Sequence, residues 1–148
     1  MSNATSGMNE ADNTDPSERF LCLHEIVEAA EQALSENIWN YLRGATETET
    51  TMKRNRQALD SVAFRPRVLN DMREVAVGGR LLGKDLALPV LLAPVGSLES
   101  FEPGGGKTAM RAAAEFGNAL MLSNVGTIPI EDVAAEADGL LISALYKR

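Results

Sequence analysis

The region from Pro89 to Tyr146 alternates between short apolar runs and segments with helical periodicity, and no other feature constrains the fold as strongly. The apolar runs are residues 89–93, 119–122 and 140–146, and the helical segments between them are 107–116 and 130–137. Short strands that are apolar throughout are typical of a parallel sheet whose two faces are both buried under helices. The order β-α-β-α-β therefore predicts an α/β fold with three parallel strands.

Local signals support the boundaries of these helices. Gly117 follows the first helical segment, at a position where helix ends favour glycine. Pro129, Glu131 and Asp132 open the second segment, where proline fits the first turn and acidic side chains face the positive end of the helix dipole.

The chain before Pro89 has a different character. Residues 1–19 are mostly polar, which predicts a disordered tail in front of a folded domain at 20–148. Apolar spacing predicts helices at 23–34 and 38–42, the second ending at Gly44. A third helix over 52–62 must end before Arg65, because Pro66 disfavours the α conformation in the residue before it.

A small β-hairpin is predicted between this third helix and the first strand. Val75 and Val77 alternate with polar or small residues, as in a strand. The pair Gly78-Gly79 suits a two-residue turn into a second strand at 80–82.

Composition narrows the class of partner. The net charge of −7, from 14 basic and 21 acidic residues, repels nucleic-acid phosphates and anionic membranes, so we expect no nucleic-acid partner. Cys22 is the only cysteine, which excludes an intrachain disulfide and a cysteine-built metal site. No run approaches the roughly 18 apolar residues of a membrane span, and the polar start lacks the parts of a signal peptide. We therefore expect a cytoplasmic protein with no membrane span.

Candidate binding residues follow the predicted strands. In parallel α/β sheets, ligands bind at the carboxyl ends of the strands, where loops and helix N-termini converge. Those ends carry Ala93-Pro94-Val95-Gly96, Ser123-Asn124 and Tyr146. The turn at 94–96 can bring main-chain atoms against a planar ring, and the Ser123 hydroxyl can donate to it. The same residues also suit a strand-terminating turn and a helix cap, so both interpretations stay open.

A nucleotide-binding alternative rests on the stretch Gly104-Gly105-Gly106-Lys107-Thr108, which resembles the end of a phosphate-binding P-loop. The P-loop spacing requires glycine five residues before Gly106, where this chain has Phe101. A dinucleotide-binding motif through Gly104, Gly106 and Ala109 fits less well, because the stretch does not directly follow a strand. The plainer interpretation is a flexible loop with a solvated Lys107.

Several segments, in order, resemble the FMN-dependent α-hydroxy-acid oxidases and dehydrogenases, the family that includes glycolate oxidase, lactate oxidase and mandelate dehydrogenase. The segments are Asn40-Tyr41-Leu42, Asn55-Arg56, Phe64-Arg65-Pro66-Arg67-Val68-Leu69, Leu88-Pro89-Val90 with Ala93-Pro94, Leu122-Ser123, Ile130-Glu131-Asp132-Val133-Ala134 and Leu145-Tyr146. The arginine-proline-arginine stretch and the Ala-Pro strand end are the most specific of them. The resemblance implies the first three strands of a TIM (β/α)8 barrel, preceded by N-terminal helices and the hairpin.

The resemblance also implies a ligand set. FMN would be the cofactor, contacted by Ala93, Pro94, Val95, Gly96 and Ser123, and a small 2-hydroxy acid would be the substrate of a protein that is a homo-oligomer at full length. Tyr41 and Tyr146 would present their hydroxyls to the substrate's carboxylate and oxyanion. Ala144 stands at a flavin-binding position where the family usually has a glutamine, and Val125 replaces an aromatic residue. Ala144 cannot donate a side-chain hydrogen bond, which puts one flavin contact in doubt.

The resemblance further implies that the chain is incomplete. A (β/α)8 barrel takes roughly 250 residues, and the family's catalytic histidine comes from a later strand, beyond Arg148. His24, the only histidine, falls near the start of the first helix and fits a surface or packing role. We expect the 148 residues alone to be inactive. A noncatalytic remnant that uses its exposed strand edge as an interaction module is the alternative.

Overall fold

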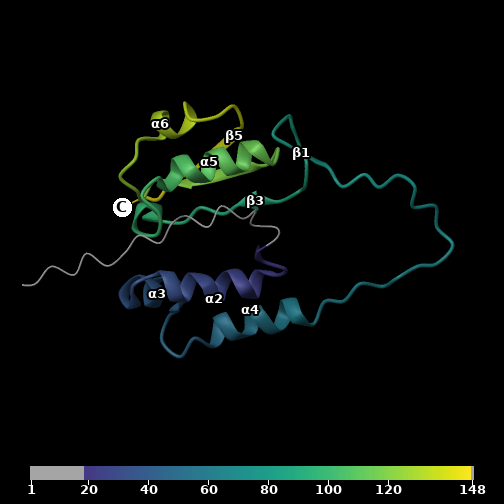
Figure 1. The fold of residues 1–148 in the computed structure, drawn as a ribbon, viewed down its shortest axis with the longest axis horizontal. Helices are drawn as coiled ribbons and strands as arrows, with labels where there is room; N and C mark the ends of the chain where they lie inside the picture. Colours follow the sequence, from purple (N-terminus) through teal and green to yellow (C-terminus); the bar gives the residue numbers. More distant parts are fainter. Residues whose placement is uncertain (1–18, 148) are drawn as a thin grey trace, which may run out of the picture. The chain divides into compact units, whose positions relative to one another are not determined.

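The computed structural model of the protein describes residues 19–147 (Figure 1). The chain divides into two compact units, Met1–Thr46 and Glu47–Arg148. The first unit contains helices α2 (Leu23–Ala33) and α3 (Glu36–Arg43), which confirms both helices predicted there. Gly44 is the C-cap of α3, as predicted, and its N–H donates to the Asn40 carbonyl at 2.8 Å. The tail predicted for residues 1–19 lies, apart from Arg19, outside the described residues.

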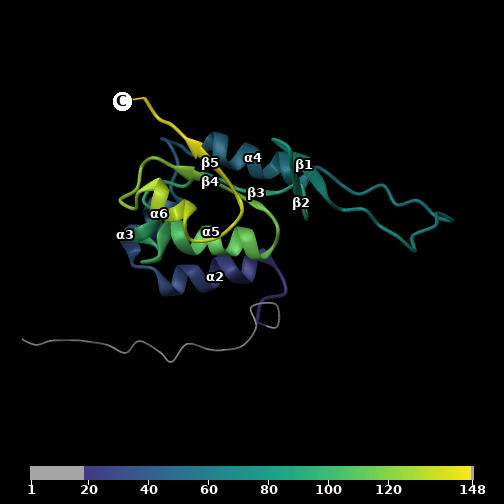
Figure 2. The same cartoon turned by 90° about the horizontal axis from the view of Figure 1, so that it is seen from above.

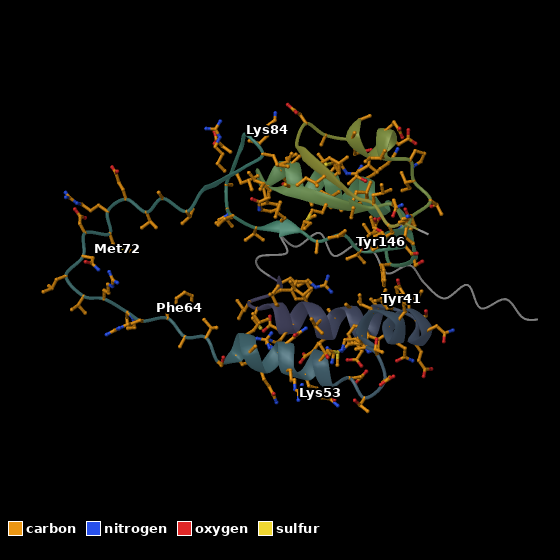
Figure 3. All side chains as sticks on the ribbon, turned by 180° about the vertical axis from the view of Figure 1, so that it is seen from behind. Tyr41, Lys53, Phe64, Met72, Lys84 and Tyr146 are labelled. Atoms are coloured by element: carbon orange, nitrogen blue, oxygen red, sulfur yellow. The ribbon has the colours of Figure 1, made fainter. Side chains whose placement is uncertain are left out.

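The second unit begins with helix α4 (Thr50–Asp60). The helix ends before Arg65, as Pro66 requires, but Val62 lies beyond it rather than inside it as predicted. The chain then runs through residues 62–77 without helix or strand, and Figure 3 labels Phe64 and Met72 along this extended segment. No helix within residues 19–147 is long and apolar enough to cross a bilayer.

The predicted hairpin is present, but its turn was placed wrongly. Strands β1 (Gly79–Leu81) and β2 (Lys84–Leu86) pair antiparallel around a turn at Leu82-Gly83, and residues 75–77 form no strand. Leu82 and Gly83 have φ of 49° and 81°, the positive values that a type I′ hairpin turn needs at both central residues. Gly79 serves close packing instead, because a Cβ there would lie 3.1 Å from Cβ of Pro89.

The remaining strands form the predicted three-stranded parallel sheet. Its order is β3 (Leu91–Leu92), β4 (Ala119–Ser123) and β5 (Leu140–Ala144). The short 3-10 helix η1 (Leu98–Ser100) and helix α5 (Gly105–Glu115) connect β3 to β4, and helix α6 (Ile130–Ala134) connects β4 to β5. The second unit is therefore mixed α/β, with a hairpin followed by a β-α-β-α-β unit, as the sequence predicts.

The core lies between β4 and the helices α5 and α6 (Figure 2). Its buried residues are Met110, Ala113, Leu120, Leu122 and Val133. Gly106 lets α5 approach the sheet, because a Cβ at this position would lie 2.8 Å from Cδ1 of Leu122. Gly106, Met110 and Ala113 recur at helical spacing, so they share the face of α5 that packs on β4.

Burial of the sheet differs from the prediction. All three strands were expected to be buried on both faces, yet only β4 is buried along most of its length. No residue of β3 or β5 is buried. β4 has a hydrogen-bonded strand on each side, whereas β3 and β5 are the edges of the three-stranded sheet.

The structure confirms the prediction that Gly117 ends helix α5. Gly117 has a φ of 63°, a left-handed conformation that glycine adopts without steric cost. Its N–H donates to the Ala114 carbonyl at 3.0 Å, and the Asn118 N–H donates to Ala113 at 2.8 Å, which is the Schellman pattern. The chain is thereby turned directly into β4.

Candidate functional site

The candidate site lies at the carboxyl ends of the three parallel strands. The register pairs Leu92 with Leu120 and Ser123 with Ala144, so the ends of β4 and β5 are level with each other. The turn from Ala93 to Gly96 follows β3 on the same edge of the sheet. Parallel strands bring their following loops together at this edge, which is where such sheets bind ligands.

The ends of β4 and β5 are joined by hydrogen bonds through Asn124. Its main-chain N–H donates to the Ala144 carbonyl at 3.1 Å, and its side-chain Oδ1 accepts the Tyr146 N–H at 3.2 Å. These contacts fix the backbone position of Tyr146, whose side chain is 52% exposed (Figure 3). The structure therefore places Ser123, Ala144 and Tyr146 beside one another.

Ser123 is the buried polar residue of the site, with 6% of its surface exposed. Its Oγ accepts the main-chain N–H of Val125 at 3.1 Å. Because a hydroxyl is both donor and acceptor, this bond leaves the Ser123 proton available to donate to another group.

The loop after β3 is held against the loop after β4. The Ser97 N–H donates to the Val125 carbonyl at 2.6 Å. Gly96 lies in the same contact, since a Cβ on it would be 3.6 Å from Cβ of Val125. Pro94 to Gly96 thus lie on a backbone that is anchored to the end of β4.

Two neighbouring hollows open beside these loops. One, of about 340 Å³, is lined by Ser97, Glu99, Ser100, Asn124, Val125, Gly126 and Thr127. The other, of about 270 Å³, is lined by Leu122, Ser123, Asn124, Gly126, Thr127, Ile128, Pro129, Ile130 and Ser143. Both lie at the strand ends that the sequence identified as the site.

Glu99 is a site residue that the sequence analysis missed. Its Oε1 accepts the N–H groups of Thr127 and Ile128 at 3.3 and 3.4 Å. These partners lie 28 and 29 residues later in the chain. No local motif predicts a contact across that separation, so only the folded arrangement reveals it.

Tyr41 belongs to the first compact unit, on α3, and its side chain is 63% exposed. Its predicted role toward substrate stays a prediction.

The glycine-rich stretch at the start of α5 already binds a carboxylate of the same chain, that of Glu102. Glu102 accepts hydrogen bonds from the main chain of Gly104, from the Thr108 hydroxyl and from the main chain of Gly105, and these bonds lower the pKa of its carboxyl. Residues 105–108 belong to α5 and are not the flexible loop of the plainer interpretation, and Lys107 Nζ lies 4.0 Å from Glu136 with 38% of its side chain exposed. A phosphate would have to displace Glu102, which argues against the P-loop alternative.

Comparisons with known proteins identify the family of the chain. A family model described as FMN-dependent dehydrogenase matches residues 30–148. The chain is 39% identical to L-lactate dehydrogenase of Pseudomonas aeruginosa over 80% of its own length and 31% of the relative's. It is 32% identical to glycolate oxidase 1 of Oryza sativa subsp. indica over 79% of its length and 32% of the relative's.

A solved structure is similar as well. Mandelate oxidase with 3,3-difluoro-2-hydroxy-3-phenylpropionic acid matches with a TM-score of 0.82 at 31% identity, over 86% of this chain and 38% of that one. The chain spans about a third of the length of the relatives it matches. Because the family model covers most of the chain, the protein belongs to the FMN-dependent α-hydroxy-acid dehydrogenase family.

Proposed function

We propose that the chain forms the first part of an FMN-dependent oxidoreductase that oxidises a small L-2-hydroxy acid to the 2-oxo acid. The relatives' names point to lactate, glycolate and mandelate as the type of substrate. In this proposal β3, β4 and β5 are the first three strands of a (β/α)8 barrel, and their carboxyl ends face the cofactor.

One observation carries the proposal: Ser123 is buried at the strand-end edge and keeps its hydroxyl proton available. A buried donor beside Pro94 to Gly96 and the end of β5 is what a planar heteroaromatic ring requires for orientation. Main-chain atoms of the 94–96 turn would lie along the ring, and Ser123 would donate to a ring nitrogen or oxygen.

The end of β5 fits the flavin less completely. Ala144 has no side-chain donor, and its carbonyl already accepts the Asn124 N–H. We therefore propose that this chain holds the ring mainly through the loops after β3 and β4.

The bound flavin would accept the hydride from the substrate's α-carbon. Tyr41 and Tyr146 would donate hydrogen bonds to the substrate's carboxylate and oxyanion, which stabilises negative charge without adding a full positive charge to the site. The chain supplies no histidine base for the hydroxyl proton at this edge, because its only histidine, His24, is an exposed residue of α2. The carboxylate at this edge, Glu99, is engaged by the N–H groups of Thr127 and Ile128. These 148 residues alone should therefore show no turnover.

The flavin site is tested by adding FMN to the 148-residue chain and following amide NMR shifts, a method that detects weak binding. The proposal expects shifts at Gly96, Ser123 and Val125. Ser123→Ala should weaken FMN binding about tenfold, because it removes a buried donor, whereas Ser61→Ala, at an exposed serine that lines neither hollow, should not. Absence of shifts at the strand ends at millimolar FMN would contradict the site.

The substrate role of Tyr41 needs a complete enzyme. We suggest a chimera in which residues 30–148 replace the matching third of the Pseudomonas aeruginosa L-lactate dehydrogenase. Tyr41→Phe should lower kcat/KM for L-lactate about 10- to 100-fold, the cost of losing a hydrogen bond to a charged group. Trp39→Phe on the same helix is the control. Unchanged kinetics in the Tyr41→Phe chimera would remove Tyr41 from the site.

A further inference from the structure

Glu99 bridges the two loops that form the candidate site. It lies on η1, in the loop after β3, and is half-buried. Its Oε1 accepts the N–H groups of Thr127 and Ile128, which belong to the loop after β4. A carboxylate oxygen accepts more than one N–H group at once, and these two bonds, at 3.3 and 3.4 Å, lie at the long end of the hydrogen-bond range.

Glycines on both sides make room for this carboxylate. A Cβ on Gly126 would lie 3.2 Å from Oε1 of Glu99. A Cβ on Gly105 would lie 2.9 Å from its Cγ, and Gly105 has a φ of 49° that other residues seldom adopt. The Glu99 side chain therefore packs against backbone from the loop after β4 and from the start of α5.

The loop that Glu99 holds also forms a hydrogen bond with the buried hydroxyl of the site. Thr127 and Ile128, which Glu99 holds, follow Val125 closely in the chain. Val125 in turn donates its N–H to Ser123 Oγ and accepts the Ser97 N–H through its carbonyl. A displacement of this loop would break the bond that sets the direction of the Ser123 hydroxyl, and it would also release the turn that carries Pro94 to Gly96.

We propose that Glu99 is a positioning residue for the flavin-facing edge. Its carboxylate holds the loop after β4 against the loop after β3. These hydrogen bonds keep Ser123 and the 94–96 turn arranged for one planar ring. The inference rests on the proposed function, because it assigns Glu99 to the same FMN site. In this proposal Glu99 acts through the two loops and makes no direct contact with the ring.

The first arm of the test measures, without any ligand, how well Glu99 protects the amides of the loop after β4. Amide hydrogen exchange in the 148-residue chain should be slow at Thr127 and Ile128. Glu99→Ala should accelerate exchange at both amides about tenfold, equivalent to a hydrogen bond of about 1.4 kcal/mol. Glu99→Gln keeps an acceptor oxygen at the same reach and should restore part of the protection. Glu115→Ala, at the exposed end of α5, should change neither amide. Unaltered exchange in Glu99→Ala would show that Glu99 does not hold the loop after β4 in place.

The second arm repeats the FMN titration with the Glu99 variants. The apparent Kd for FMN should rise about tenfold in Glu99→Ala and recover partly in Glu99→Gln. Gly117→Ala, which also lowers stability but lies after the far end of α5, should leave the Kd unchanged, because a loss of stability alone does not disturb the strand-end loops. If Glu99→Ala loses amide protection but binds FMN like the unsubstituted chain, the positioning role is wrong and the proposed function stands. If the unsubstituted chain gives no shifts with FMN, the proposed function fails first, and the flavin role of Glu99 fails with it.

Discussion

Strand β4 and the segment 62–77 are both rich in large apolar residues, yet they have opposite environments. Leu120 in β4 is 1% exposed, whereas Leu69 in the segment is 102% exposed and Phe64 is 101% exposed. β4 has β3 and β5 as hydrogen-bonded neighbours and α5 packed against it. Residues 62–77 contain no strand and pair with none in the described part of the chain. The comparison shows that apolar composition leads to burial only where other elements supply a complementary surface.

The largest effect expected from this comparison comes from one substitution made in both regions. Leu120→Ala should lower the free energy of unfolding by about 2–5 kcal/mol, because it leaves a cavity in a packed core. Leu69→Ala should change it by less than about 0.5 kcal/mol, as for other exposed positions. Urea unfolding followed by far-UV circular dichroism measures both.

A milder variant keeps this test informative if Leu120→Ala does not fold. Leu120→Met nearly conserves volume and should cost less than about 1.5 kcal/mol. Equal losses for Leu120→Ala and Leu69→Ala would mean that the two regions are not packed as differently as the structure shows.

The same contrast explains which parts of the fold could be predicted from sequence. The type and order of the elements from 89 to 146 were predictable, because periodicity and helix-end residues such as Gly117 agreed. Their lengths were not, because β3, α6 and β5 span only 91–92, 130–134 and 140–144. The hairpin turn was misplaced because glycine serves two purposes that composition does not separate. Gly83 supplies a positive φ, while Gly79 supplies space for Pro89. Which purpose applies depends on neighbours that only the folded chain brings together.

The candidate site was predictable to a similar extent. Its location followed from the strand ends, since that edge is a property of parallel α/β topology. The internal organisation did not follow, because the contacts of Glu99 with Thr127 and of Asn124 with Tyr146 join residues from separate loops.

A smaller effect should distinguish two glycines that both have positive φ. Alanine in a left-handed conformation costs roughly 1–2 kcal/mol. Gly117→Ala should exceed this cost, because the new Cβ would lie 3.2 Å from Cβ of Ala87 beside the packed end of α5. Gly83→Ala meets no atom within 4 Å, and it lies in a two-stranded hairpin that can open locally. Gly117→Ala should therefore lower the urea midpoint more than Gly83→Ala, and the reverse order would contradict the assigned role of Gly117.

The smallest effect concerns two carboxyl groups with lowered pKa values, one in each region. Glu102 is held by hydrogen bonds from Gly104 and Thr108 at the start of α5. Asp71 is held by Arg73, only two residues away. A carboxyl whose pKa is lower in the folded chain adds stability above its unfolded pKa, and this stability is lost as pH falls through the folded value. For Glu102 the loss should begin near its ordinary pKa of 4.5 and continue below it.

This dependence of stability on pH should be larger for Glu102 than for Asp71, because only Glu102 relies on partners that folding brings together. The helix start that holds Glu102 exists only in the folded chain, whereas the Asp71–Arg73 pair can form in the unfolded chain as well. Glu102→Gln should therefore flatten the fall of unfolding free energy between about pH 5 and about pH 3, while Asp71→Asn should leave it unchanged. Urea unfolding at a series of pH values measures this slope. An equal flattening by Asp71→Asn would show that the segment 62–77 orders on folding, so that its high exposure does not mean a lack of structure.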